Sequence, residues 1–247
     1  MFNSIETRVP IKQLIASQIE DAILTKKYLP GAKLPSENEL CEQFNVSRTS
    51  VREALQILSA HGLITVEKGK GMFVNRITSE SVISPFEKYL MQRLDRHTVT
   101  DLIRARQMIE PSIARQAALN RTEEDLKNLE DDIKNMEECT EGYKEQVELD
   151  MIFHQHLALA TKNQIVPLLL RVIQGILPEL KSQVYVNVED AKEAAIIWHS
   201  KIFDAVKRGD ADNAFQSMVE HLKKAEEHSN KVLQLEEKET NKGEPNE

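Results

Sequence analysis

One carboxylate and three imidazoles stand at spacings that would let them bind a single metal ion. Asp150 and His154 are four residues apart, so both project from the same face of a helix. His199 lies ten residues before Gly209 and His221 lies twelve residues after it. If the helices on either side of that glycine fold back antiparallel, both rings stand about 15 to 18 Å from the turn, at a rise of about 1.5 Å per residue.

The four side chains could then meet inside a helical bundle, as metal ligands often do. Each also has an ordinary explanation, because Asp150 with His154 is a common helix pair and a single histidine often packs in a core or lies on the surface. His156 points to another face of the same helix and is a less favourable ligand. The spacing alone leaves both a metal site and plain packing open.

A second group of residues has the chemistry to contact DNA. Arg48, Thr49, Ser50 and Arg52 gather at the start of a predicted helix, away from its apolar face. Arginine can read guanine edges with two hydrogen bonds, and Thr and Ser can reach bases or phosphates. The alternative, a solvated arginine face on some other helical domain, is disfavoured by the order of the neighbouring elements.

Those elements predict a winged helix-turn-helix over residues 1–76. An amphipathic helix follows Pro10, and the capping box that begins at Ser36 opens a second, short helix. Ser47 can cap a third helix that ends near Gly62, and this helix would enter the major groove. Two short apolar stretches around a basic, glycine-rich tip then predict a small β-hairpin, the wing, which carries Lys68 and Gly69.

The rest of the chain predicts an all-helical bundle over residues 98–235, since apolar residues recur at helical spacing and no period-two alternation is present. The fold class is therefore mainly α. Residues 77–97 would form a linker that includes Pro85, and the charged tail, 236–247, is expected to be disordered. The helices are expected at 98–119, 123–139, 144–161, 164–186, 189–207 and 211–235.

Charge is divided unevenly between these parts. The net charge is -8, but residues 1–76 hold ten Lys and Arg against eight Asp and Glu, or +2, so the remainder carries -10. Only the N-terminal part could face phosphate comfortably. Two widely separated cysteines argue against disulfides, and the lack of a long apolar run or signal peptide predicts a cytoplasmic protein with no membrane partner.

The N-terminal motifs resemble the DNA-binding signature of GntR-type bacterial regulators. They are the stretches 34–40, 46–55, 62–64 and 69–71. The resemblance implies that Arg48 and Arg52 contact operator bases or phosphates. The assisting residues would be Ser36, Thr49, Ser50, Lys68 and Gly69. Many members have arginine where this chain has Asn38, so one expected DNA contact is weakened or replaced.

The helical part is similar to the FCD effector domain of the FadR subfamily, on the stretches 150–154, 198–199 and 209–221 together with Asn163. In that family the matching Asp and three His residues bind a divalent metal, so the resemblance implies that Asp150, His154, His199 and His221 do so here. Zinc, nickel and manganese all remain candidates. An octahedral ion would keep about two positions open for a carboxylate. The resemblance also places Arg106, and less strongly Asn163, in the effector cavity.

We therefore expect a homodimeric, ligand-responsive regulator that binds double-stranded operator DNA and a small carboxylate effector. We favour a repressor, but the sequence does not distinguish a repressor from an activator. One alternative is a metal-dependent hydrolase with an attached DNA-binding domain. It is disfavoured because no further carboxylate is evident near the ligands, Glu148 and Glu220 being expected to point off the shared face. The other alternative is a constitutive DNA-binding protein without metal or effector. The sequence does not identify the effector.

Overall fold

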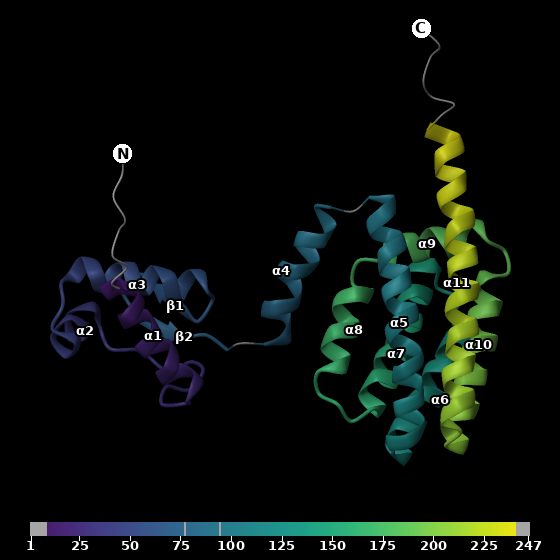
Figure 1. Ribbon diagram of the computed structural model, residues 1–247, viewed down its shortest axis with the longest axis horizontal. Coiled ribbons are helices and arrows are strands. Elements are labelled where there is room, and N and C mark those ends of the chain that lie inside the picture. Colours follow the sequence, from purple (N-terminus) through teal and green to yellow (C-terminus); the bar gives the residue numbers. More distant parts are fainter. Residues whose placement is uncertain (1–8, 77, 94, 241–247) are drawn as a thin grey trace, which may run out of the picture. The chain divides into compact units, whose positions relative to one another are not determined.

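The structure, a computed structural model, describes residues 9–76, 78–93 and 95–240. The chain divides into two compact units, Met1–Val82 and Ile83–Glu247 (Figure 1). The first unit holds a short helical core and a hairpin, and the second is built from helices.

The first unit has the predicted order of elements. Its helices are α1 (Ile11–Leu24), α2 (Glu37–Phe44) and α3 (Arg48–Ala60), followed by the strands β1 (Ile64–Glu67) and β2 (Gly71–Val74). The strands pair antiparallel, with Ile64 opposite Val74. Both predicted caps are present: Ser36 and Glu39 form a capping box, and the Ser47 hydroxyl accepts a hydrogen bond from the backbone N–H of Ser50.

The apolar face of α3 fixes the direction of its polar face. Val51, Leu55 and Leu58 are fully or almost fully buried in the core of this unit, where α3 packs against α1. Burial of each such side chain stabilises the fold by roughly 1.5 to 3 kcal/mol. Arg48, the first residue of α3, and Arg52, which lies beside this buried face, are both exposed.

The helices of the remaining chain match the predicted segments with two differences. They are α4 (Ser79–Met91), α5 (Arg96–Asn120), α6 (Glu123–Glu138), α7 (Tyr143–Ala160), α8 (Val166–Gln174), α9 (Pro178–Asn187), α10 (Ala191–Arg208) and α11 (Ala211–Thr240). The segment predicted as one helix over 164–186 is two, α8 and α9. Proline has no N–H to donate and its ring clashes with the preceding turn, so Pro178 begins a new helix.

The second difference concerns the tail and the linker. The sequence predicts disorder from Glu236, whereas α11 continues to Thr240; the rest of the predicted tail, 241–247, lies outside the described residues. Glu and Lys favour helix, and extending a helix avoids the cost of nucleation. The predicted linker, 77–97, contains the 13-residue helix α4, with Pro85 inside it.

The packing of α5, α7, α10 and α11 positions the functional residues of the helical unit. α11 packs along α5 and α10, and α5 also contacts α7 (Figure 1). Gly209 ends α10 in the left-handed conformation, with φ of 73°, which a residue with a side chain adopts less readily. The chain reverses there, so α10 and α11 lie antiparallel, as the sequence predicts. Among the described residues, no helix is long and apolar enough to cross a membrane.

Candidate metal centre and ligand pocket

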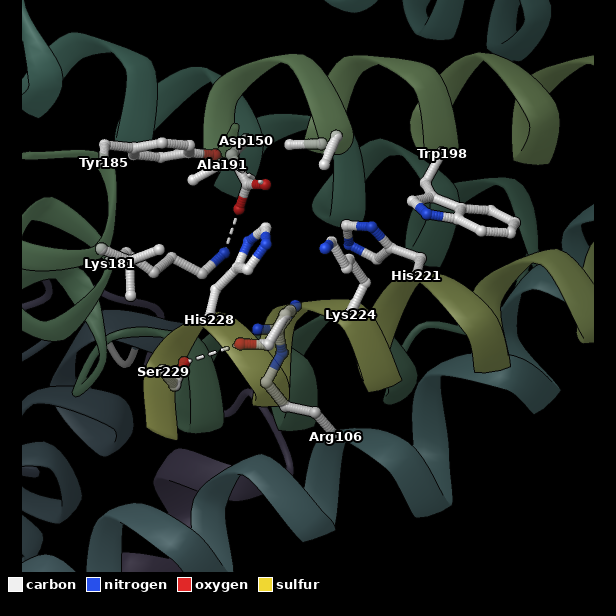
Figure 2. Close-up of a pocket in the computed structure, with 14 residues that line it drawn as sticks. Arg106, Asp150, Lys181, Tyr185, Ala191, Trp198, His221, Lys224, His228 and Ser229 are labelled. Atoms are coloured by element: carbon white, nitrogen blue, oxygen red, sulfur yellow. Dashed lines mark hydrogen bonds and ion pairs between the residues drawn. The ribbon is translucent and has the colours of Figure 1, made fainter. Parts of the chain in front are cut away.

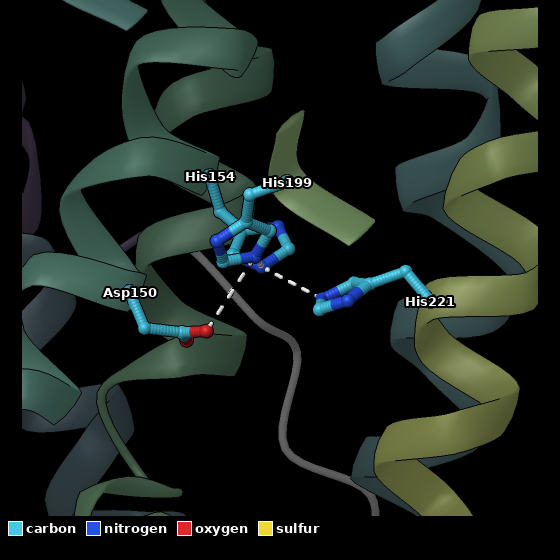
Figure 3. A group of neighbouring side chains, drawn as sticks. All are labelled: Asp150, His154, His199 and His221. Atoms are coloured by element: carbon cyan, nitrogen blue, oxygen red, sulfur yellow. Dashed lines mark hydrogen bonds and ion pairs between the residues drawn. The ribbon is translucent and has the colours of Figure 1, made fainter. Parts of the chain in front are cut away.

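Asp150, His154, His199 and His221 meet in the interior of the helical unit (Figure 3). α7 supplies Asp150 and His154, α10 supplies His199 and α11 supplies His221. One ligand atom from each residue lies within 4.8 Å of the others, and no residue of the four is more than 5% exposed. The Nε2 atom of His154 lies 3.3 Å from Nε2 of His199 and 3.3 Å from Nε2 of His221.

A carboxylate behind the cluster orients the central imidazole. Oε2 of Glu110, on α5, lies 2.6 Å from Nδ1 of His154, and Oε1 of Glu110 accepts a hydrogen bond of 2.5 Å from Nε of Arg106. A proton on Nδ1 that is shared with Glu110 leaves the Nε2 lone pair directed at the cluster. Carboxylates of this kind hold metal-binding histidines in the correct tautomer.

The protonation states of the cluster suit a divalent cation. Burial lowers the pKa of His199 to about 3 and, together with the neighbouring His199 and His154 rings, lowers the pKa of His221 well below its usual range. Burial alone would raise the pKa of Asp150, but Lys181 and the nearby rings outweigh it, and the pKa falls well below its ordinary value. Neutral imidazoles and an ionised carboxylate are the forms in which these residues bind metal, so this donor set fits such an ion.

A pocket leads to this cluster (Figure 2). Arg106, Asp150 and His221 line it, and the space inside, including the opening to solvent, is about 520 Å³. Arg106 is only 4% exposed, and its Nη2 atom lies 3.5 Å from Nε2 of His154. A small acid bound here would therefore meet a guanidinium and the metal ligands together.

Sequence reasoning missed the residues that α9 and the far part of α11 add to the pocket. From α9, the Lys181 ammonium forms an ion pair with Oδ2 of Asp150, and the Tyr185 hydroxyl lies 3.5 Å from Oδ1 of the same residue. Lys224 and His228 line the pocket from α11. The only signal in the sequence is their helical spacing of three and seven residues from His221.

The structure separates Asn163 from this pocket. Asn163 lies in the turn between α7 and α8, where its Oδ1 atom accepts a hydrogen bond of 2.9 Å from the backbone N–H of Ile165. It lines a different cavity, together with Ile109 and Ser112 of α5. The expectation that Asn163 and Arg106 share one cavity is not met. Asn163 lies in the turn that follows the C-terminal end of α7, away from Asp150 in the middle of that helix.

One other side chain, Glu110, bears on the hydrolase alternative. The expectation that no further carboxylate stands near the ligands is wrong, since Glu110 does. However, both oxygens of Glu110 are engaged by Arg106 and His154, which leaves it poorly placed to accept a proton from water.

His156 points away from the cluster, and its Nδ1 atom lies 2.6 Å from Oδ2 of Asp132.

The residues expected to contact DNA lie on α2, α3 and the wing. Arg48, Thr49 and Arg52 are exposed at the start of α3, and Nε of Arg52 donates a hydrogen bond of 2.8 Å to Oε2 of Glu37. Ser50 is half-buried and its hydroxyl lies 3.0 Å from that of Ser47. A single hollow of the first unit is lined by Ser36, Arg52, Lys68 and Gly69.

Comparison with known protein families assigns both units. Residues 11–74 match the family described as "Bacterial regulatory proteins, gntR family", and residues 101–224 match the FCD domain. The first match covers the helix-turn-helix and wing. The second covers all four residues of the buried cluster.

Individual proteins with similar sequences are transcription regulators. The Uxu operon regulator of Haemophilus influenzae is 32% identical over 231 residues, which cover 87% of this chain and 79% of that protein. The galactonate operon transcriptional repressor of Escherichia coli is 27% identical, over 80% of this chain and 87% of that one. A solved GntR structure from Streptococcus agalactiae has a TM-score of 0.63 at 26% identity and covers 85% of this chain and 96% of its own.

Proposed function

This chain belongs to the GntR family of bacterial regulatory proteins, and we propose that this DNA-binding transcription regulator is a repressor whose operator binding is controlled by a small organic acid bound in its helical unit. The observation that carries this proposal is the pocket in which a buried guanidinium, Arg106, lies beside the Asp150 and histidine cluster. One relative with a similar sequence is named as a repressor of a galactonate operon, which is consistent with an acid effector.

We propose a divalent metal ion, zinc, nickel or manganese, as the anchor of the effector. Asp150, His154, His199 and His221 would hold it, and Glu110 would fix the His154 ring from behind. A cation in this buried cluster supplies a strong electrostatic attraction for a carboxylate group. Arg106 would bind the same carboxylate through its N–H groups.

In the DNA-binding unit, we propose that Arg48 and Arg52 contact operator bases or phosphates. Both are exposed at the N-terminal end of α3, the part of a recognition helix that enters the major groove. Thr49, Ser50, Lys68 and Gly69 would assist from the same helix and the wing. The Ser36 hydroxyl is engaged in the cap of α2, so its contribution to DNA binding would pass through the backbone or a second hydrogen bond.

A homodimer would place two DNA-binding units on the two half-sites of a palindromic operator. In the helical unit, four of the eight residues that line a cavity between α5 and α8 are apolar, namely Ile109, Ile113, Val166 and Leu169. Leu169 is 55% exposed and Met108 of α5 is 80% exposed. Exposed apolar surface of this kind often marks a protein interface, and a second copy of the chain is the proposed partner.

Fluorescence anisotropy on the zinc-loaded, full-length protein tests the proposal. Labelled promoter DNA from the genes beside this one is titrated with protein in the presence of different organic acids, and a random duplex is the control. We expect specific binding that at least one acid weakens, because an effector acts only through different affinities for the two states of the protein. If every acid leaves operator affinity unchanged, the proposed control by an effector is wrong.

A further inference from the structure

The pocket has a second polar end, formed by α11 beyond the metal ligand His221. Lys224 and His228 follow His221 at intervals of three and seven residues, so all three lie on one face of the helix and line the pocket (Figure 2). His228 is only 3% exposed. Its Nε2 atom lies 3.5 Å from Oδ1 of Asp190 and has no hydrogen-bond partner among the described residues.

Lys224 is also incompletely satisfied. Its ammonium lies 3.2 Å from Oδ2 of Asp190, a carboxylate whose side chain is 55% exposed and thus largely hydrated. An ammonium has three N–H donors, and this single ion pair uses one of them. Lys224 and His228 therefore offer N–H donors to a ligand in the pocket.

The charges around the pocket balance before any metal is added. Arg106 pairs with Glu110, Lys181 with Asp150, and Lys224 with Asp190. A divalent cation therefore adds two positive charges that no protein group offsets. Uncompensated charge in a buried site is costly. A ligand with one carboxylate offsets half of this charge, and a ligand with two anionic groups offsets all of it.

The spacing along α11 limits the length of such a ligand. At about 1.5 Å per residue, His228 lies roughly 10 Å further along the helix than His221. The metal–ligand bond and the hydrogen bond at the other end take up about half of this distance. The remainder suits two anionic groups joined by a few carbon atoms.

We propose that the effector is a dianion on a short carbon chain, with one carboxylate at the metal and Arg106 and a second anionic group at Lys224 and His228. This inference rests on the proposed function and narrows the class of effector. Lys224 and His228 act as specificity-determining residues, since they distinguish a second anionic group from a neutral hydroxyl end.

Calorimetric titration of the zinc-loaded, full-length protein with matched acids tests this. D-gluconate carries one carboxylate, whereas D-glucarate replaces its terminal hydroxymethyl group by a second carboxylate, and 6-phosphogluconate carries a phosphate there. L-lactate and L-malate form a shorter pair. We expect at least one two-anion acid to bind roughly tenfold or more tightly than its one-anion partner, because its second anionic group accepts charge-assisted hydrogen bonds. The glucarate and phosphogluconate arms separate a second carboxylate from a phosphate.

Variants locate the second anionic end. Lys224→Met and His228→Leu should each remove most of the preference for two-anion acids, while the zinc content, measured by elemental analysis, stays that of the unmodified protein. Lys223→Met is the matched control, because Lys223 is the adjacent lysine and is exposed. His228→Gln, which keeps an N–H donor, should retain part of the preference. Thermal melts confirm that each variant is folded.

The result that overturns the inference is equal affinity for one-anion and two-anion acids, or a preference that survives both substitutions. If one-anion acids release operator DNA as well as two-anion acids do, the regulator proposed above stands and the dianion inference fails. If no acid changes operator affinity, the proposed function itself fails. Absence of binding by all five acids also contradicts the inference.

Discussion

Oε2 of Glu110 lies 2.6 Å from Nδ1 of His154, and this contact joins α5 to the buried cluster on α7, α10 and α11. The same carboxylate is held by Arg106, which lines the pocket. One side chain thus connects the residue proposed to bind the effector carboxylate to the central ligand of the proposed metal site.

Glu110→Gln should weaken metal binding by about 10- to 100-fold, the usual cost of losing a carboxylate behind a metal-binding histidine. Competition against a coloured chelator measures this affinity. Glu137→Gln, at an exposed position of α6, is the control and should bind metal like the unmodified protein. Equal affinity in both variants would show that Glu110 does not position His154 for a metal.

Asp150→Asn should abolish tight metal binding and the thermal stabilisation that metal gives. An ion that binds only the folded protein stabilises it by about 2.7 kcal/mol at a free concentration 100 times the Kd. Melting curves with zinc and with EDTA should differ for the unmodified protein and coincide for the variant. A similar zinc-dependent shift in both proteins would exclude Asp150 as a ligand.

Arg48→Ala should reduce specific operator affinity by about 1 to 3 kcal/mol if the arginine reads a base. Arg52→Ala should do the same, and Glu37→Gln should change operator affinity because it removes the partner that holds Arg52 at 2.8 Å. Anisotropy at a fixed salt concentration measures the effect. Lys27→Ala, exposed after α1, is the control, and equal losses on operator and random DNA would assign the arginines to phosphate contact alone.

Leu58→Ala should destabilise the DNA-binding unit by about 2 to 5 kcal/mol, because Leu58 is fully buried and the surrounding core cannot close the cavity completely. Leu24→Ala is the matched control, since Leu24 is 62% exposed. Urea unfolding followed by circular dichroism should resolve the loss. A small effect of Leu58→Ala, comparable with that of the control, would contradict the packing of α3.

Asp125 should make the stability of the helical unit depend on pH. Burial would raise its pKa, but hydrogen bonds with Lys162 and Thr122 outweigh this and lower the pKa below the ordinary value of 3.8. Its stabilising contribution is therefore present above about pH 4 and is lost as the pH falls through the lowered pKa. The difference in unfolding free energy between the unmodified protein and Asp125→Asn should shrink over that range. If the difference in unfolding free energy stays constant between neutral and acidic pH, the pKa of Asp125 is the same in the folded and unfolded states.

Much of the fold and part of the site could be predicted from the sequence, because both depend on local spacing. The capping serines, Ser36 and Ser47, mark helix starts through hydrogen bonds to residues three positions away. The meeting of His199 with His221 follows from one reversal at Gly209, a turn that has a clear local signal. Local spacing therefore places Asp150 beside His154 and His199 beside His221, and only the packing of α7 against α10 and α11 brings the two pairs together.

The tertiary structure alone decided what surrounds those four residues. Glu110 reaches His154 because α5 packs beside α7, and Lys181 reaches Asp150 because α9 separates from α8 and packs against α7. Asn163 is excluded from the pocket for the same kind of reason. Such contacts depend on the angles and offsets between helices distant in sequence. Helical periodicity determines which face of a helix is buried, but it contains no information on which partner lies opposite.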